Sequence, residues 1–235
     1  MMPTEPAGPP PVIAIDGPAA SGKGTIAKAV AGALGYRYLE SGALYRLVAL
    51  EASSQKVDAD DAPRLAALGD GLRLSFDGER IFLCGQDVSE AIRTEDVSRQ
   101  ASRIAVIPRL RIALLSRQRA FRGPPGLVAE GRDMGTVVFP DAKLKLYLTA
   151  SAVARAGRRY KQLIDKGNST TIESLLRDIQ DRDGRDSARA RAPLKVAAEA
   201  IVVDTTELGP DAVVALVLQQ YQALMSGGSA GVDGT

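Results

Sequence analysis

The chain has 235 residues, 45% hydrophobic and 25% charged, an ordinary globular composition and a length that can bury a sizeable core. It has no histidine and one cysteine, which excludes histidine general bases, Ser-His triads, His-ligated metals and an internal disulfide. The formal net charge is only +2, so bulk nucleic-acid binding is not indicated, although 22 arginines against 8 lysines favour phosphate chemistry.

The N-terminal segment 1–11 contains five prolines, one glutamate and no lysine or arginine, and we expect a disordered tail there. It lacks the basic start and the apolar stretch of a secretory signal. No apolar run approaches the ~18 residues that span a bilayer. These features predict a cytoplasmic protein that does not contact a membrane.

An alternation of strands and helices follows the tail. Val12–Ile15 is a short apolar run typical of a strand buried on both faces, and Lys23–Leu34 has helical spacing. Tyr36–Leu39 and Ala43–Ala52 repeat the order as a second strand and a second helix. Such a βαβα order indicates a parallel sheet with helices on both faces.

The pattern then changes to that of a β-hairpin. Leu72–Phe76 and Arg80–Cys84 flank an Asp-Gly-Glu turn at 77–79. Because an antiparallel hairpin does not belong in a parallel sheet, we expect residues 64–98 to form an inserted subdomain.

The remaining core strands are predicted at Gly126–Ala129, Lys143–Leu148 and Ala200–Val203, with a closing helix at Pro210–Leu224. The stretch 151–191 is predicted to be helical and is heavily charged. The expected core comprises residues 12–63, 99–150 and 192–225, and the tail 226–235 is expected to be disordered. The fold class predicted from these segments is α/β, with a five-stranded parallel sheet flanked by helices.

The strongest motif is a phosphate-binding loop that begins at Gly17. Its residues are Gly17, Pro18, Ala19, Ala20, Ser21, Gly22, Lys23, Gly24 and Thr25. A glycine, four residues and then Gly-Lys, between a strand and a helix, is the P-loop spacing. Backbone amides and the helix N-terminus would face ATP phosphates, and the lysine would bridge the β and γ phosphates.

The residue after the P-loop lysine departs from the usual Ser or Thr. Gly24 stands there, and the hydroxyl of Thr25 comes one place later. We therefore expect Mg²⁺ to be bound mainly through ATP and water, with no direct protein ligand.

A guanine-binding GTPase is excluded by the lack of an Asn-Lys-x-Asp motif, since the one asparagine, Asn168, precedes Ser169. A D-x-x-G match at 181–184 lies among scattered charges and is attributed to chance.

Three longer motifs accompany the P-loop. They are Glu-Ser-Gly-Ala-Leu-Tyr-Arg at 40–46, Glu-Gly-Arg-Asp-Met-Gly-Thr-Val-Val-Phe-Pro at 130–140 and Arg-Asp-Gly-Arg-Asp-Ser-Ala-Arg at 182–189. With these motifs and the arginine-rich segment 108–119, the chain from about residue 12 to 222 resembles the bacterial cytidylate (CMP/dCMP) kinase family. Glu40 and Glu130 stand where the family would also have Asp, and both keep the charge.

The resemblance implies transfer of the γ-phosphate of ATP to CMP or dCMP, with Mg²⁺. It implies that 64–98 is the NMP-binding subdomain and that 151–191 is a helical lid. The implied substrate-binding residues are Ser41, Arg46, Ser102, Arg111, Arg132, Asp133, Arg182, Asp186 and Arg189. The implied catalytic residues are Lys23, Arg132, Arg182 and Arg189.

The motifs also make physical sense by themselves. Ser41 and the pair Arg132-Asp133 follow core strands, at the sheet edge where open α/β folds bind ligands. Cytosine offers an amino donor that a carboxylate such as Asp133 would accept, and acceptors that Arg111, with Ser102, would serve. The phosphate of a monophosphate is already ionised near pH 7, so no general base is required.

The charged helix leaves two interpretations open. Arg182, Arg185, Asp186 and Arg189 are spaced to share one helical face, and a lid would bring them over the γ-phosphate. The same spacing, with Asp178, also fits a purely structural ion-pair network.

Two other functions stay open from the residues. One is a related small-molecule kinase of the adenylate-kinase or shikimate-kinase type. The other is a nucleotide-binding regulatory or RNA-binding protein without turnover, since seven arginines and no acidic residue lie between Asp96 and Glu130. The preferred partners are ATP and CMP or dCMP, with no nucleic acid, in a monomer. The sequence does not choose between CMP and dCMP or settle activity on UMP.

Overall fold

A computed structural model describes residues 8–77, 80–165, 167–189 and 192–227. Most of the expected tail 1–11 and of the expected tail 226–235 lies outside these residues. At the described edge, the carbonyl of Pro10 accepts from Nε of Arg122 (2.7 Å) and that of Pro11 from the N–H of Leu127 (2.9 Å). No helix of the described chain combines the length and apolar character needed to cross a membrane.

The chain divides into two compact units. The first comprises residues up to Leu39, Phe121–Ser187 and the part from Ala192 onward. The second comprises Glu40–Ala120 and Ala188–Arg191, so it contains the expected insertion 64–98 within a wider segment.

A five-stranded sheet forms the first unit, as predicted, in the order β2-β6-β1-β7-β8. The strands are β1 (Val12–Asp16), β2 (Arg37–Glu40), β6 (Leu127–Gly131), β7 (Leu144–Thr149) and β8 (Ile201–Asp204). β1 lies at the centre of the sheet and pairs in parallel with β6 and β7. All five of its residues are buried, as expected for a central strand. The carboxyl end of β1 therefore lies between the carboxyl ends of two neighbouring strands.

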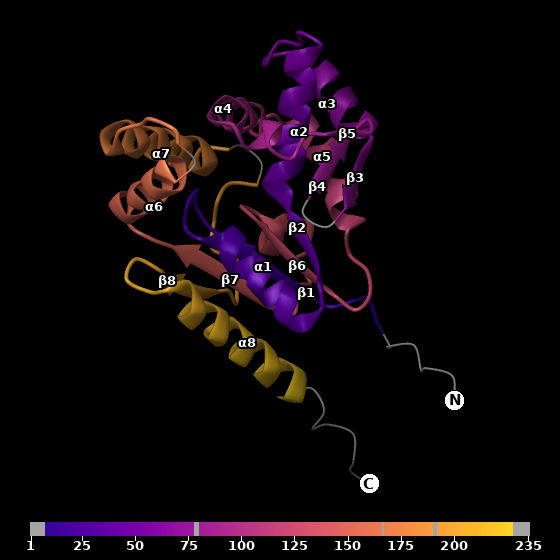
Figure 1. The fold of residues 1–235 in the computed structure, drawn as a ribbon. Helices are drawn as coiled ribbons and strands as arrows, with labels where there is room; N and C mark the ends of the chain where they lie inside the picture. The colour runs from indigo at the N-terminus through magenta and orange to yellow at the C-terminus, as the bar shows by residue number, and fades with distance from the viewer. Residues whose placement is uncertain (1–7, 78–79, 166, 190–191, 228–235) are drawn as a thin grey trace. The chain divides into compact units, whose positions relative to one another are not determined.

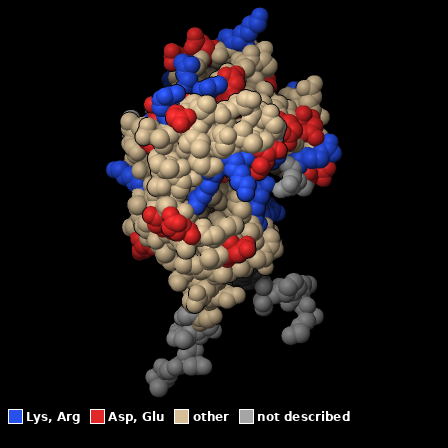
Figure 2. Space-filling model, turned by 60° about the vertical axis from the view of Figure 1, so that its left-hand side comes forward, with Lys and Arg blue, Asp and Glu red and all other residues tan. Residues whose placement is uncertain are grey.

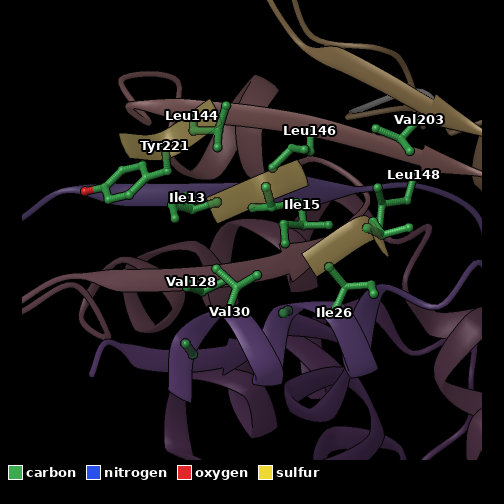
Figure 3. Close-up of a cluster of buried hydrophobic side chains, with 14 residues drawn as sticks. Ile13, Ile15, Ile26, Val30, Val128, Leu144, Leu146, Leu148, Val203 and Tyr221 are labelled. Atoms are coloured by element: carbon green, nitrogen blue, oxygen red, sulfur yellow. The ribbon is translucent and has the colours of Figure 1, made fainter. Parts of the chain in front are cut away.

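Two helices cover one face of this sheet, α1 (Lys23–Leu34) and α8 (Pro210–Gly227), and they pack against each other (Figure 1). Figure 3 shows Ile13 and Ile15 of β1 between Val128 of β6 and the β7 leucines, with Tyr221 of α8 beside them. Alternate residues of β7 are buried, which is the period of a strand with one face on this core. The core holds the start of α1 and the end of β1 in fixed register.

Two further helices of the first unit, α6 (Ala152–Ile164) and α7 (Ile172–Ser187), pack on each other through a small apolar cluster. α7 ends before Arg189, so the prediction that Arg189 shares its helical face is wrong. The carbonyl of Asp186, which a continuing helix would use, instead accepts the N–H of Leu194 at 3.0 Å. A π-helical turn, η2 (Met134–Val138), follows β6 closely in the chain.

The second unit combines helices with a small antiparallel sheet. Its elements are α2 (Ser41–Ser54), α3 (Ala62–Gly71), β3 (Leu74–Asp77), β4 (Arg80–Leu83), β5 (Gln86–Asp87), the 3₁₀ turn η1 (Ala91–Arg93), α4 (Glu95–Ile104) and α5 (Pro108–Arg119). The predicted hairpin is confirmed, since β3 pairs antiparallel with β4 and Asp77 lies opposite Arg80. Its Gly78-Glu79 turn falls outside the described residues. α3 packs closely on α5, where a Cβ on Gly69 would lie 2.9 Å from Cδ1 of Leu110.

Candidate functional site

The P-loop runs from β1 into α1 on a backbone that needs glycine. A Cβ on Gly17 would lie 2.0 Å from the carbonyl oxygen of Leu148, and its φ of +149° is one that side chains rarely adopt. Gly22, which caps α1, has a left-handed φ of +90°. The loop is therefore fixed against β7 by the absence of side chains, and its amides are free to face an anion.

Lys23 folds back over this loop. Its Nζ donates to the carbonyl of Pro18 (2.6 Å) and to Oγ of Ser21 (3.4 Å), and the residue is only 5% exposed. Burial, helped by the positive charges of Arg132 and Arg182 and opposed by Glu130 and Asp186, lowers the pKa of Lys23 from 10.5 to about 7. Three cations from three separate segments thus act on one another in the first unit.

Arg132 is held by a carboxylate from α7. Its Nε donates to Oδ2 of Asp186 at 2.6 Å, and Asp186 is 1% exposed. Burial alone would lower the pKa of Arg132, but Asp186 and Glu130 outweigh it and hold the pKa above its ordinary value. The guanidinium is therefore a fixed positive charge beside the P-loop lysine. Together, the group Lys23, Arg132, Arg182, Glu130 and Asp186 is called the charge cluster below.

Asp16 ends β1 immediately before the P-loop. Its two carboxylate oxygens accept the backbone N–H groups of Met134 and Gly135, each at 2.8 Å. Burial raises the pKa of Asp16 to about 6, although these two hydrogen bonds act in the opposite direction. The carboxylate ties the end of the central strand to the segment that follows Arg132 and Asp133.

The carboxylate of Glu130 lies beside the glycine that follows the P-loop lysine. Oε1 of Glu130 accepts from the hydroxyl of Tyr38 at 2.9 Å, and a Cβ on Gly24 would lie 3.1 Å from the same oxygen. The carboxylate oxygen thus lies in tight contact with the place that a Cβ at position 24 would take. Glu130 is buried there, beside the position where many P-loops have a hydroxyl.

The helices α6 and α7 are joined to each other and to the P-loop by arginines. Arg155 of α6 forms two hydrogen bonds to the carboxylate of Asp183 on α7, at 3.1 and 2.7 Å. The same guanidinium donates to the carbonyl of Ala19 at 3.3 Å. Arg158 donates to Oγ1 of Thr205 at 3.0 Å, and that hydroxyl in turn donates to the carbonyl of Ser21 at 3.2 Å.

In the second unit, Arg46 folds back toward the start of its own helix α2. Its Nη2 lies 2.5 Å from Oε1 of Glu40, and a Cβ on Gly42 would come within 3.2 Å of Nη1. The buried Nε of Arg46 has no hydrogen-bond partner within the described chain. Ser41, 5% exposed, is the first residue of the helix. An arginine with spare donors lies beside a helix N-terminus, which suits an anion.

Ser102 and Arg111 lie on neighbouring helices of the same unit and are both buried. Nη1 of Arg111 donates to the carbonyl of Ala105 at 3.1 Å, and its guanidinium carbon lies 5.8 Å from the centre of the Tyr45 ring. The arginine is therefore oriented against α2, the helix that carries Arg46.

The predicted site residues fall into two groups. The first unit brings the P-loop, Arg132, Arg182 and Asp186 into the charge cluster, and Asp133 follows Arg132 directly. The second unit contains the rest, Ser41, Arg46, Ser102, Arg111 and Arg189. Asp186, which the spacing also allowed to pair with Arg182, makes a hydrogen-bonded ion pair with Arg132.

Sequence reasoning missed Asp16, Arg155 and Asp183, and it assigned Glu130 no part in the site. Asp16 and Glu130 had a readable signal, because each is a carboxylate at the end of an apolar strand, where open α/β sheets bind ligands. Asp183 lies within the motif at 182–189, but nothing in the sequence indicated that it pairs with Arg155.

The described residues contain no group of three or more acidic or cysteine side chains placed to hold a metal ion. Figure 2 shows basic and acidic side chains together on one face. That face carries both signs of charge, in keeping with the net charge of +2.

Comparison with known proteins identifies one family. Residues 13–223 match the family model described as cytidylate kinase. A cytidylate kinase of Burkholderia vietnamiensis (strain G4 / LMG 22486) is 57% identical over 224 residues, covering 95% of this chain and 98% of the relative. A cytidylate kinase of Polynucleobacter necessarius subsp. necessarius (strain STIR1) is 56% identical, covering 90% and 99%.

Proposed function

Because the chain belongs to the cytidylate kinase family, we propose that it transfers the γ-phosphate of ATP to CMP or dCMP at the charge cluster. The observation that carries this proposal is the interaction of the P-loop lysine with two arginines from other segments. Burial and the charges of Arg132 and Arg182 lower the pKa of Lys23 to about 7. Negative phosphate oxygens bound there would reduce the electrostatic repulsion between these three cations.

The donor side is the P-loop. Gly17, Gly22 and the intervening residues leave backbone amides to face the ATP phosphates, and the α1 N-terminus adds its partial positive charge. Lys23 would exchange its hydrogen bond to Pro18 for the β and γ phosphates. All nine residues Gly17–Thr25 are assigned to ATP.

The acceptor side needs positioning rather than a base. A monophosphate oxygen is ionised near pH 7 and is itself the nucleophile, which forms a bond to the γ-phosphorus as the bond to the β-phosphate oxygen breaks. The enzyme must align the two phosphates, spread the charge in transit and exclude water. We assign the acceptor phosphate to Arg46 and Arg132, and the charge in transit to Arg132, Arg182 and Arg189.

Recognition of the base and sugar is assigned to Ser41, Ser102, Arg111, Asp133 and Asp186. Asp133 would accept from the cytosine amino group, and Arg111 with Ser102 would donate to its acceptors. Asp133→Ala should raise KM for CMP far more than KM for ATP and reduce discrimination against other monophosphates. Unchanged CMP kinetics in this variant would remove Asp133 from the base site.

Mg²⁺ is the cofactor that we propose, bound mainly through ATP and water, and Glu130 is the carboxylate that would hold its water shell. Mg²⁺ prefers oxygen ligands and keeps several waters, and the Glu130 carboxylate lies beside Gly24 at the start of α1. When bound, Mg²⁺ would supply positive charge that offsets the negative charge of the ATP phosphates. Glu130→Gln should reduce the advantage of Mg-ATP over metal-free ATP in calorimetric binding, and an unchanged advantage would exclude Glu130.

The pair α6–α7 is proposed as the lid, and the segment around the β3–β4 hairpin as the NMP-binding subdomain. Arg155 joins both lid helices to the P-loop carbonyl of Ala19, so lid position and donor site are coupled. We further propose a cytoplasmic monomer that does not bind nucleic acid.

An assay of ADP release, with each monophosphate added in turn, tests the function. We expect ADP release only when CMP or dCMP is present, and little with AMP or with no acceptor. ADP release independent of an acceptor would indicate an ATPase, and a preference for AMP would indicate an adenylate-kinase type of enzyme. Binding of ATP without any release would indicate a regulatory protein.

A further inference from the structure

Asp16 lies outside the P-loop and outside every set of residues predicted from the sequence. It is the last residue of the central strand and is 3% exposed. A buried carboxylate is costly unless its oxygens are hydrogen-bonded. Here each oxygen accepts one backbone N–H at 2.8 Å, from Met134 and from Gly135, which offsets part of the cost of burial.

The two N–H donors open the π-helical turn η2, and the first N–H groups of a helical segment have no partner within it. Asp16 therefore supplies the acceptors from a strand more than a hundred residues earlier. The residues immediately before these donors are Arg132 and Asp133. Fixing the start of η2 consequently fixes the backbone of the pair assigned to CMP.

The rest of the turn leaves it little freedom to move. The carbonyl of Asp133 accepts the N–H groups of Val137 and Val138 at 2.9 and 3.1 Å. A Cβ on Gly135 would lie 3.3 Å from Cγ of Lys145, so the turn packs directly on β7. The turn is therefore rigid, and its hydrogen bonds to Asp16 set its position relative to the end of β1.

The P-loop does not depend on Asp16 in the same way. Its first residue, Gly17, is seated independently against the carbonyl of Leu148. A change at position 16 would therefore displace the acceptor-side turn more than the donor loop.

We propose that Asp16 is a positioning residue that sets the Arg132-Asp133 turn for the nucleoside monophosphate while touching neither nucleotide. The proposal rests on the proposed function, which assigns those two residues to CMP. It assigns Asp16 a role in acceptor binding, distinct from electrostatic support of Lys23 and from general support of the core.

The test compares Asp16→Asn with Asp16→Glu. Asparagine keeps the shape but offers one oxygen and one N–H group, so one backbone donor loses its acceptor. Glutamate keeps the charge near Lys23 but displaces the oxygens by a methylene group. Val217→Ala, in the core on α8, is the matched control for a loss of stability alone. Hydrogen exchange of the Met134 and Gly135 amides reports directly whether their hydrogen bonds to Asp16 are formed.

We expect both Asp16 variants to lower kcat/KM for CMP roughly ten- to a hundredfold, mainly through KM, with KM for ATP within about twofold. The Met134 and Gly135 amides should exchange faster in both variants, and Val217→Ala should change neither property. If Asp16→Asn does not fold, Asp16→Glu and the protection of these amides in the unaltered protein decide the question.

Several results would overturn the proposal. They are unprotected Met134 and Gly135 amides in the unaltered protein, an equal rise in KM for ATP, or rescue of CMP kinetics by Asp16→Glu. CMP kinetics of Arg132→Ala and Asp133→Ala are measured in parallel as a test of the acceptor assignment. If these two change CMP kinetics and the Asp16 variants do not, only the positioning role fails. If neither does, the acceptor assignment fails and the positioning role with it.

Discussion

Two apolar clusters of the first unit differ greatly in size. Beneath the P-loop, fourteen buried residues from four strands and two helices form the main core. Between α6 and α7, the buried apolar residues of the described chain are four, Ala156, Leu163, Leu175 and Ile179, and the ion pair of Arg155 with Asp183 assists them. The P-loop is therefore supported by a large core, whereas α7, which carries Arg182, packs through a small cluster.

This difference indicates how stability and movement are divided. Regions with few buried apolar contacts open at lower free energy than the main core. The P-loop must hold its shape, and a lid must open to exchange nucleotides, so each region has the packing that its proposed role requires. Substitutions in the two regions should consequently have different effects.

The largest effect is expected where the two regions meet electrostatically, at Lys23. Lys23→Ala should lower kcat/KM at least roughly a thousandfold, about 4 kcal/mol of transition-state binding. The fold should survive because the core beneath the loop is untouched. Steady-state kinetics and circular dichroism check this, and near-normal turnover would mean that the donor site is elsewhere.

Leucine truncations compare the two clusters directly. Leu146→Ala, in the main core, should cost about 2–5 kcal/mol of unfolding free energy. Leu163→Ala, between α6 and α7, should cost roughly half of that or less, because its cluster is small and partly open. Urea unfolding measures both, and equal losses would contradict the division of stability proposed above.

The arginines of α7 separate a catalytic role from a structural one. Arg182→Ala should lose at least roughly tenfold in kcat/KM, or about 1.4 kcal/mol, with little change in Tm. Arg177→Ala, on the exposed side of the same helix, is the matched control and should retain activity. If Arg182→Ala instead lowers Tm and keeps its kinetics, the arginines form a structural network and α7 is not a lid.

The last effect is a pH dependence of stability. Since the folded-state pKa of Lys23 is lowered from 10.5 to about 7, the unfolded chain binds more protons between these values. This group should therefore make unfolding free energy rise with pH above 7, by up to about 1.4 kcal/mol per pH unit. Urea unfolding at pH 7 and pH 9 should show a rise in the unaltered protein that Lys23→Met lacks. An identical pH dependence would place the lysine in a less buried environment.

Much of the fold could be predicted because its signals are local. The buried strands are short apolar runs, and the P-loop is identified by glycines at fixed spacing. The hairpin was predicted from an Asp-Gly turn between two apolar runs. Each of these features depends on neighbouring residues only.

The rest depends on contacts between distant segments. α7 ends before Arg189 because the N–H of Leu194 takes the carbonyl of Asp186, which helical spacing does not reveal. The hydrogen bonds of Asp16 join the end of β1 to the motif at 130–140, and the close approach of Glu130 to Gly24 joins that motif to the P-loop. Residue types identified candidates, but their partners had to come from the structure.

The claim that donor and acceptor phosphates meet at the charge cluster can be tested with one ligand. An analogue that joins adenosine to cytidine through five phosphates presents both substrates at once. We predict that the protein binds it at least roughly a hundredfold more tightly than ATP or CMP alone, as expected for a mimic of the transfer state. Arg132→Ala should lose most of this gain, and Arg177→Ala should retain it. An analogue that binds no more tightly than ATP would contradict a shared site at Lys23 and Arg132.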